Sequence, residues 1–521
     1  MARHGKWLRC RFFGLLALSA VFFPFAGGFA QPSWQKPQPV HWRVRQALLD
    51  WDTSELKIAQ RLAADRHPGH PLNTWLKSYV LLLSAQLPGM PGEVTRFLAE
   101  QENLISALAP PAQPNPLYLL CRAELHLHRA RLHVASSSWW SAAYQLRQYF
   151  QLLESARKTY PSFERVFDKS LYPVKLLLGL SPERFHGLMR WFGLPPETEM
   201  VSARFTHTSR SLDTAWGGFF LEEHALLVAY TLYHLDRPAS QITAWSHKAV
   251  QRCDGSPGVL MAYLGNHFLL QNHLAESAFA GIYQLDCRKG ARLPAVYRIC
   301  GRHQLYMGHY REATLLFNRY LEATGLSIED DCYLARWRSW AEYLANENAT
   351  KKQASETPQL RTKCTGNGNL AWQMRIDRQQ FSPYPEALLE VRIMLEAGRY
   401  EEAARLLEHT TQPDKSSAVR FLWWYEKARA AQALEQWQAA RTCFQKAIRA
   451  GYKFDVQGYR WPAAHVFLGE VLVRQEDWDG AKTAFHKAGT FRDYPFEEGL
   501  QRRIKRGLAQ IARQQPLAPD G

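Results

Sequence analysis

Apolar residues recur along the chain at intervals of three and four positions, and no stretch alternates apolar and polar residues over the length of a β-strand. The first spacing lines one face of an α-helix, whereas strict alternation is typical of a strand. We therefore predict an almost wholly α-helical protein. Helices are expected over residues 43–61, 72–84, 117–136 and 139–159, with a proline-rich connection over 110–116.

One pattern recurs in the C-terminal half: an aromatic residue, an alanine three positions later, and a bulky apolar residue four positions after that. The copies are Tyr310/Ala313/Phe317, Tyr400/Ala403/Leu407, Trp437/Ala440/Phe444 and Trp478/Ala481/Phe485. Ala447 and Ala488 extend the last two copies by another small residue. Such periodicity indicates stacked helical repeats, because one unit cannot bury its apolar face alone.

This pattern resembles the tetratricopeptide repeat, a helical hairpin that stacks on its neighbours. The resemblance implies an all-α, right-handed helical-hairpin solenoid with the aromatic residue at the turn between the two helices. Close helix crossing requires small residues, so we expect Gly301, Gly469 and the recurrent alanines to admit a neighbouring backbone. The large phenylalanines are expected to join one hairpin to the next.

Two further segments resemble a narrower group. Residues 170–194, SLYPVKLLLGLSPERFHGLMRWFGL, and the tail segment 493–511 are similar to parts of eukaryotic mitochondrial-outer-membrane tetratricopeptide proteins implicated in inclusion-body clearance, and to bacterial exported relatives of that family. The resemblance implies a shared architecture and no catalytic residue. The mitochondrial and lipid-associated roles of the eukaryotic members are not carried over to an exported protein.

The first thirty residues are typical of an export signal. A basic segment with Arg3, Lys6, Arg9 and Arg11 precedes an apolar run over 12–25, and small residues precede Gln31. A membrane anchor is the alternative, but the run is shorter than the roughly 20 residues that a span needs. Cys10 precedes the apolar run, so a lipid anchor is not expected. We expect an exported protein in the periplasm of a Gram-negative bacterium.

The chain is basic, with a formal net charge of +16. Without residues 1–30 it keeps 60 Lys and Arg against 48 Asp and Glu, a net charge of +12. A basic surface favours acidic partners, and nucleic acid is the usual candidate. Export argues against nucleic acid and favours acidic peptides, anionic lipid headgroups or cell-wall polymers. The alternative is that the charge serves solubility alone.

Seven cysteines follow the export signal, at positions 121, 253, 287, 300, 332, 364 and 443. No Cys-x-x-Cys motif occurs, so zinc and thioredoxin-like sites are not expected. We expect buried free thiols, although Cys253, Cys287 and Cys332 lie near predicted helix ends and could pair.

The pattern divides the chain into five parts. These are a signal peptide (1–30), a divergent N-terminal helical region (31–196), helical hairpins with degenerate repeats (197–345), a loop or insertion (346–382), and a C-terminal repeat array with a capping helix (383–521). The insertion is poor in apolar residues and shows little periodicity.

The last helix is expected to cap the array. Leu500, Ile504, Leu508 and Ile511 form one apolar stripe, whereas Arg502, Arg503, Lys505 and Arg506 are expected to face largely outward. Terminal repeats need such a polar outer face. The alternative is a basic amphipathic helix that lies on anionic membrane.

The sequence predicts no catalytic residue, metal or cofactor. His126, His128 and His133 share one predicted helix, but no acidic residue at four-residue spacing completes a ligand set. The zinc-protease, phosphate-loop and serine-hydrolase motifs are also missing from the sequence.

Concave-surface positions of the repeats carry several arginines. Counting the turn aromatic as position seventeen, the ninth position is Arg302, Arg392 and Arg429 in three copies and Glu470 in the fourth. The resemblance predicts that these arginines line a groove and bind acidic ligands, because guanidinium groups match carboxylates two bonds at a time. The predicted partner-binding residues are Arg298, Arg302, Tyr306, Arg392, Tyr425, Arg429 and Arg474. The alternative is that the arginines pair with nearby acids such as Glu396.

These observations favour an exported scaffold or adaptor that binds a protein or peptide, is not an enzyme and needs no cofactor. Two alternatives remain open: a binding protein for a small anionic or carbohydrate ligand, and an envelope enzyme with a site in the N-terminal half. A polar pocket with several titratable groups near residues 126–140 would favour the enzyme.

Overall fold

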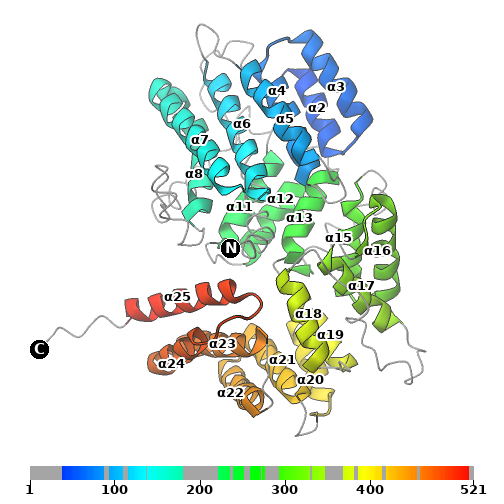
Figure 1. The fold of residues 1–521 in the computed structure, drawn as a ribbon, viewed down its shortest axis with the longest axis vertical. Helices are drawn as coiled ribbons and strands as arrows, with labels where there is room; N and C mark the ends of the chain where they lie inside the picture. Colours follow the sequence, from blue (N-terminus) through cyan, green and yellow to red (C-terminus); the bar gives the residue numbers. More distant parts are fainter. Residues whose placement is uncertain are drawn as a thin grey trace, which may run out of the picture. The chain divides into compact units, whose positions relative to one another are not determined.

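The computed structural model describes residues 38–86, 93–108, 115–136, 138–179, 221–234, 239–250, 259–271, 273–275, 293–328, 331–345, 368–380, 385–413, 418–453 and 458–514. These residues form α-helices and one short 3-10 helix, with no β-strand among them (Figure 1). The predicted fold class, all-α helical hairpins of the tetratricopeptide type, is confirmed. The chain divides into two compact units. The first unit comprises residues 1–271, 277–299 and 323–325, and the second comprises residues 272–276, 300–322 and 326–521.

The first unit is built from antiparallel helix pairs. Its helices are α2 (Pro39–Leu49), α3 (Thr53–Arg66), α4 (Pro71–Gln86), α5 (Glu93–Ala107), α6 (Pro116–Ala135), α7 (Trp139–Thr159), the 3-10 helix η2 (Pro161–Phe163), α8 (Glu164–Gly179), α11 (Leu221–His234), α12 (Ala239–Val250) and α13 (Val259–Gln271). The closest packed pairs are α2 with α3, α6 with α7, and α11 with α12.

The helices expected over 117–136 and 139–159 are confirmed as α6 and α7. The single helix expected over 43–61 was wrong, because the chain breaks between α2 and α3. Trp51 adopts a left-handed conformation with φ of 51°. Asp52 then caps α3 by accepting a hydrogen bond from the Glu55 amide at 3.0 Å. Side-chain capping by aspartate starts a new helix where apolar periodicity alone suggests continuity.

The second unit carries the repeats. Its helices are α15 (Ala295–Tyr306), α16 (Tyr310–Thr324), α17 (Cys332–Ala345), α18 (Gly368–Gln380), α19 (Glu386–Ala397), α20 (Tyr400–His409), α21 (Val419–Ala433), α22 (Trp437–Lys453), α23 (Arg460–Arg474), α24 (Trp478–Gly489) and α25 (Glu497–Gln514). Of α15 only the part from residue 300 belongs to this unit, and of α16 only the part up to residue 322. Each turn aromatic of the sequence pattern is the first residue of the second helix of its hairpin: Tyr310, Tyr400, Trp437 and Trp478. The hairpins are therefore in the register that the pattern predicts.

The repeat core is also where the pattern places it. The alanines and the large apolar residues of all four copies are fully buried: Ala313, Ala403, Ala440 and Ala481, and Phe317, Leu407, Phe444 and Phe485. A Cβ atom on Gly301 would lie 2.7 Å from a ring carbon of Phe317, and one on Gly469 would lie 2.7 Å from a ring carbon of Phe485. These glycines thus chiefly admit a ring of the paired helix, where we expected a backbone.

The segment 346–382 contains a helix. We expected a loop or insertion there, and this was wrong for residues 368–380, which form α18. Polar residues dominate α18, so the spacing of its few apolar residues gives no helical signal.

Three of the four cysteines among the described residues are buried free thiols, as expected: Cys121, Cys300 and Cys443. Cys332 is disulfide-bonded, so the expectation of free thiols does not hold for it. Cys253, Cys287 and Cys364 lie outside the described residues, as do the signal peptide and the segment 180–220. Among the helices that the structure describes, none combines the length and apolar character of a membrane span.

The final helix α25 packs against α23 and α24 through its apolar stripe. Leu500, Ile504 and Ile511 are buried, and Leu508 is half-buried. Arg502, Lys505 and Arg506 are exposed, whereas Arg503 donates hydrogen bonds to Glu470 of α23 at 2.7 and 2.5 Å.

Candidate partner-binding site

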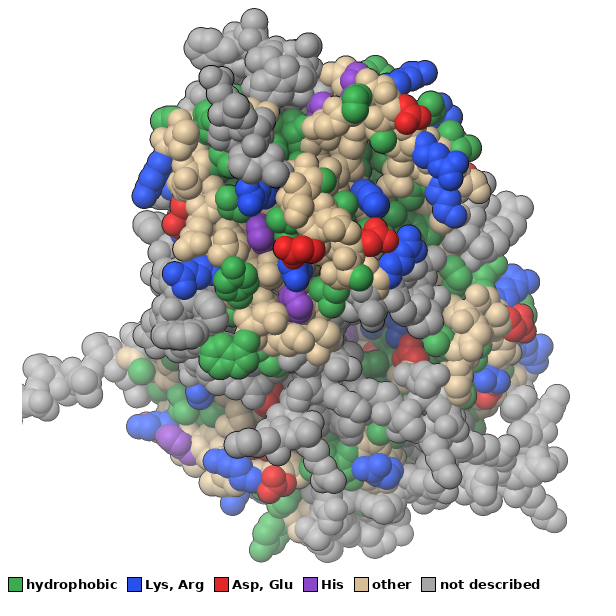
Figure 2. All heavy atoms as spheres, turned by 45° about the horizontal axis from the view of Figure 1, so that its top comes forward, with side chains coloured by type: hydrophobic (Ala, Val, Ile, Leu, Met, Phe, Trp, Pro, Cys, Tyr) green, Lys and Arg blue, Asp and Glu red, His purple; other side chains and the backbone are tan. Residues whose placement is uncertain are grey.

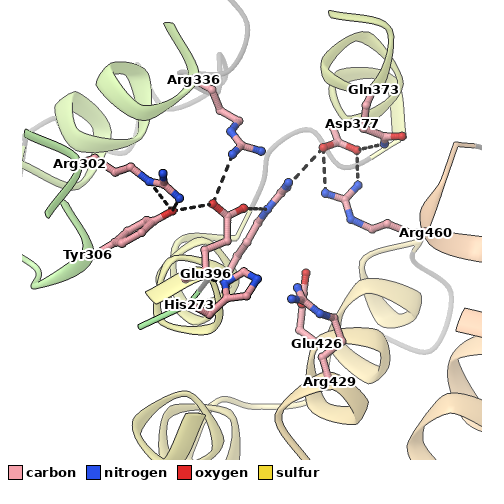
Figure 3. Close-up of polar contacts among 11 residues, drawn as sticks. His273, Arg302, Tyr306, Arg336, Gln373, Asp377, Glu396, Glu426, Arg429 and Arg460 are labelled. Atoms are coloured by element: carbon pink, nitrogen blue, oxygen red, sulfur yellow. Dashed lines mark hydrogen bonds and ion pairs between the residues drawn. The ribbon is translucent and has the colours of Figure 1, made fainter. Parts of the chain in front are cut away.

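Polar side chains of the second unit converge on Glu396, the penultimate residue of α19 (Figure 3). One carboxylate oxygen lies 3.3 Å from Nη2 of Arg336 and accepts a hydrogen bond from the Tyr306 hydroxyl at 3.4 Å. The other lies 3.5 Å from Nε of Arg392. Nδ1 of His273 donates to the backbone carbonyl of Glu396 at 2.8 Å. Residues from four separate segments are thereby brought together around one carboxylate.

The end of α19 explains how His273 reaches the backbone carbonyl of Glu396. Gly398 follows the helix with φ of 83°, a conformation that glycine adopts without strain. A Cβ atom there would overlap the backbone carbonyl of His273. Arg399 then donates to the backbone carbonyl of Tyr306 at 2.9 Å. The helix end therefore fixes both neighbouring segments.

The charges around Glu396 determine its protonation. Burial opposes ionisation, but the positive charges of Arg336, Arg392 and Arg302 outweigh burial and lower the pKa of Glu396 to about 2. Burial raises the pKa of Tyr306 to about 12. At neutral pH the carboxylate is ionised and the phenol is protonated.

A second carboxylate, Asp377 of α18, lies in the same cluster. Arg460 pairs with both of its oxygens, with Nη2 at 2.9 Å from Oδ2, and Nη1 of Arg392 lies 3.5 Å from Oδ2. Gln373 donates to Oδ1 at 2.5 Å. Burial raises the pKa of Asp377, but Arg460 and Arg392 reverse this and hold it below its ordinary value. Arg392 therefore contacts both carboxylates.

A third carboxylate lies on α21, next in the array. Nη1 of Arg429 donates to Glu426 at 3.2 Å, and Glu426 is buried. Burial disfavours the charged guanidinium, but Glu426 outweighs burial and raises the pKa of Arg429. The Arg429 side chain is 25% solvent-exposed.

Aromatic rings support the guanidinium groups. Arg302 lies over the rings of Trp337 and Tyr306, at 4.7 and 5.0 Å from their centroids. Arg336 and Arg392 lie over Trp340 at 4.6 and 5.0 Å. Stacking orients a guanidinium and directs its N–H edges towards acceptors. Here those acceptors include the Tyr306 hydroxyl and the carboxylates of Glu396 and Asp377, so the arrangement suits planar anions such as carboxylates.

The structure brings together part of the predicted set. Arg302 and Tyr306 lie beside Glu396, and Arg429 is on the neighbouring α21 (Figure 3). Nε of Arg392 also lies 3.5 Å from the Glu396 carboxylate. The alternative interpretation, that the arginines pair with nearby acids, describes Arg392 and Arg429 correctly. The other three predicted residues make different contacts. Tyr425 is buried among Phe421, Phe444 and Phe467. Arg474 is exposed over Trp437, and Arg298 is half-buried on α15. Glu470, the exception at position nine, pairs with Arg503.

Sequence reasoning missed Arg336, Gln373, Asp377, Glu426 and Arg460. Arg460 precedes the counted repeat positions, and Asp377 lies in the stretch that we expected to be a loop. Glu426 lies next to the predicted residue Tyr425, but no counted repeat position marks the other four.

Titratable groups also gather in the first unit, near the helix that carries the three histidines. Ser170 of α8 donates to Glu124 of α6 at 2.7 Å, and burial raises the pKa of Glu124 to about 8. His126 hydrogen-bonds Gln145 at 2.7 Å, and His128 hydrogen-bonds Ser78 at 2.7 Å. All these side chains are buried, and their hydrogen bonds join α4, α6, α7 and α8.

Within the described residues, no three or more His, Cys, Asp and Glu side chains are grouped so that they could hold a metal ion. On the face drawn in Figure 2, Lys and Arg side chains are spread among acidic, apolar and other side chains and form no continuous patch.

No protein-family model and no curated protein matches this chain. The solved structures similar to it at low identity include the following three. The human IFIT1 dimer with PPP-AAAA is 12% identical, covers 92% of this chain and 96% of its own, and has a TM-score of 0.30. Yeast Tom70 is 13% identical, covers 91% and 95%, and has a TM-score of 0.23. The Cut9 and Hcn1 hetero-tetramer of the APC/C is 12% identical, covers 94% and 95%, and has a TM-score of 0.27. The fold assignment therefore rests on the helix order and the repeat core of this chain.

Proposed function

We propose that this protein is an exported scaffold or adaptor whose repeat array binds acidic side chains of a protein or peptide partner in the cell envelope. Binding takes place on the first helices of the hairpins, around Arg302 and Arg429, and needs no cofactor. Nucleic acid is not the partner in this proposal, because an exported protein does not meet it routinely.

The observation that carries the proposal is that guanidinium groups along the first helices already bind carboxylates. Arg392 of α19 lies against Glu396, and Arg429 of α21 donates to Glu426. Aromatic rings hold Arg302, Arg336 and Arg392 in place. Guanidinium groups placed in this way suit the acidic side chains of a partner.

Two further features support the proposal. The stacked arginines are held in place before a ligand arrives, so less side-chain entropy is lost on binding. Arg302 and Arg429 are only half-buried, and thus accessible from solvent. A small anionic ligand would use the same chemistry, but a face that extends over several hairpins suits a peptide better.

The test is affinity capture from envelope extract with mass spectrometry, using residues 31–521 as bait. We expect the variant Arg302→Ala/Arg429→Ala to lose partners that the unaltered chain captures, with unchanged circular dichroism and melting temperature. Arg405→Ala/Arg449→Ala is the matched control, because it removes two exposed arginines from second helices. This control should capture normally.

Capture of the same proteins by the folded Arg302/Arg429 variant would refute the binding site. Recovery of RNA, with protein capture abolished by nuclease, would refute the choice of partner.

A further inference from the structure

Helix α18 is polar in sequence but buried on most sides. Leu370, Ala371, Gln373, Met374, Ile376 and Asp377 are all buried, and only Arg375 is exposed among residues 370–377. A helix on a protein surface usually buries one stripe. Burial around most of the circumference is typical of a helix that lies in a groove.

The contacts of α18 show which groove this is. Asp377 pairs with Arg392 of α19 and with Arg460 of α23. These two first helices belong to hairpins that are separated in the array by α21 and α22. Gln373 accepts a hydrogen bond from the backbone amide of Tyr459 at 3.1 Å. Helix α18 therefore lies along the side of the array that the first helices form.

The other end of α18 makes apolar contacts. Leu370, Ala371 and Met374 form a cluster with Cys332 of α17, and Phe496 packs against the cluster. Leu370, Met374 and Asp377 are spaced by four and three residues, so one face of α18 carries both the apolar contacts and the carboxylate.

The site that holds Asp377 is a built carboxylate site. Asp377 is 4% exposed, Arg392 5% and Arg460 1%. Both oxygens of Asp377 accept hydrogen bonds from guanidinium groups, and Gln373 donates one more. Paired guanidinium donors around one carboxylate give geometric selectivity as well as binding energy.

We infer that α18 is an internal ligand of the array, and that the Arg392/Arg460 site receives an Asp or Glu side chain from a helical segment of the partner. The inference rests on the proposed function and specifies its partner. That segment carries apolar residues at positions i and i+4 and a carboxylate at i+7, as Leu370, Met374 and Asp377 do. The partner helix replaces α18.

The forces that hold α18 allow this exchange. For a buried ion pair, the cost of removing both charges from water roughly cancels their attraction. Among the described residues, the small cluster around Leu370 and Met374 and the hydrogen bond between Gln373 and the Tyr459 amide contribute further. The hairpins, in contrast, each bury a large apolar residue such as Phe444 or Phe485 completely. Helix α18 should thus detach at a lower free energy than the hairpins unfold.

The probe is a synthetic peptide with the sequence of residues 368–380, labelled with fluorescein, and the measurement is fluorescence anisotropy with residues 31–521. We expect Asp377→Asn in the protein to lower the Kd of the peptide at least tenfold, because the internal competitor loses its carboxylate. The same substitution in the peptide should abolish binding. Arg375→Ala, an exposed change on the same helix, should leave the Kd at the value of the unaltered protein.

A second measurement needs no variant. Saturating the unaltered protein with a 13C- and 15N-labelled peptide should speed hydrogen exchange of the protein's own residues 368–380, because the peptide displaces them. Isotope labels separate the fragments of peptide and protein by mass. Unchanged exchange in α18, or a folded Asp377→Asn variant whose Kd equals that of the unaltered protein, would overturn the inference.

The two proposals fail separately. If the Arg302/Arg429 variant loses its captured partners while the peptide does not compete with α18, the partner binds elsewhere on the array and this inference falls. If the peptide competes while capture is insensitive to Arg302 and Arg429, the Arg392/Arg460 site stands and the scaffold proposal falls.

Discussion

Glu396 is a partly buried carboxylate that the surrounding arginines keep ionised. Its pKa of about 2 lies below the ordinary value of 4.5, because nearby arginines outweigh the cost of burial. A group with a lowered pKa in the folded state stabilises the fold when it is ionised. This contribution is complete above the ordinary pKa and is lost as the pH falls from about 4.5 to about 2.

Replacing Glu396 with Gln should therefore lower the free energy of unfolding at pH 7 by about 3 kcal/mol, since one pKa unit corresponds to about 1.4 kcal/mol. The difference between the two proteins should shrink between pH 4.5 and pH 2, as Glu396 becomes protonated. Urea denaturation across this pH range measures it. Glu401→Gln, at an exposed position on α20, is the control and should change little. A difference that stays constant with pH would contradict the assigned charge state.

At the scale of residues, the sequence predicts those residues that occupy the same position in successive repeats. It does not predict contacts between residues that no repeat position relates. The buried alanines and phenylalanines follow from repeat spacing, and counting positions predicted that Arg302 and Arg392 share one surface of the array. The pairs Arg460 with Asp377 and Arg336 with Glu396 join residues that are 83 and 60 positions apart. No period links such residues, so only the folded chain shows which arginine meets which acid.

At the scale of elements, α25 differs from the hairpins because it has no partner helix beyond it in the described chain. Its buried face carries Leu500, Ile504 and Ile511, and Arg503 binds Glu470 of α23. The exposed cations Arg502, Lys505 and Arg506 form the outer face. This division matches a cap, because terminal repeats need one apolar and one polar face.

Deleting residues 500–521 should lower the melting temperature by several degrees or cause aggregation, because the apolar surface of α23 and α24 becomes exposed. Differential scanning calorimetry and light scattering measure both effects. The companion variant, Arg502→Gln/Lys505→Gln/Arg506→Gln, should keep the melting temperature. If the deletion is harmless, and the triple variant stops binding to anionic vesicles that the unaltered protein binds, α25 is a membrane-surface helix instead.

The sequence predicted elements well where apolar residues recur at helical spacing, as in α6, α7 and the repeat hairpins. It failed at α18 and at the break between α2 and α3. Helix α18 is stabilised by tertiary contacts that bury Gln373 and Asp377, and tertiary context overrides weak local signals. The break depends on the Asp52 cap, which apolar periodicity does not report.

At the scale of the whole molecule, the proposed function requires export. The basic segment, the apolar run and the small residues before Gln31 are the basis for this expectation. Intact mass spectrometry of the native protein should give a chain that begins at Gln31, and osmotic shock should release it with the periplasmic fraction. A chain that keeps Met1, or that stays with membranes after a high-salt wash, would rule out the exported location.

The two glycines beside Phe485 limit how this array can change its length. Gly469 of α23 lies against one part of the ring, and a Cβ atom on Gly507 of α25 would come even closer to it. Repeat arrays usually grow or shrink by whole units, because each unit contacts only its neighbours. Here the same ring is enclosed by a repeat helix and by the final helix. A repeat grafted ahead of α25 would therefore have to give this ring the same room in both flanking helices, which in this chain Gly469 and Gly507 provide.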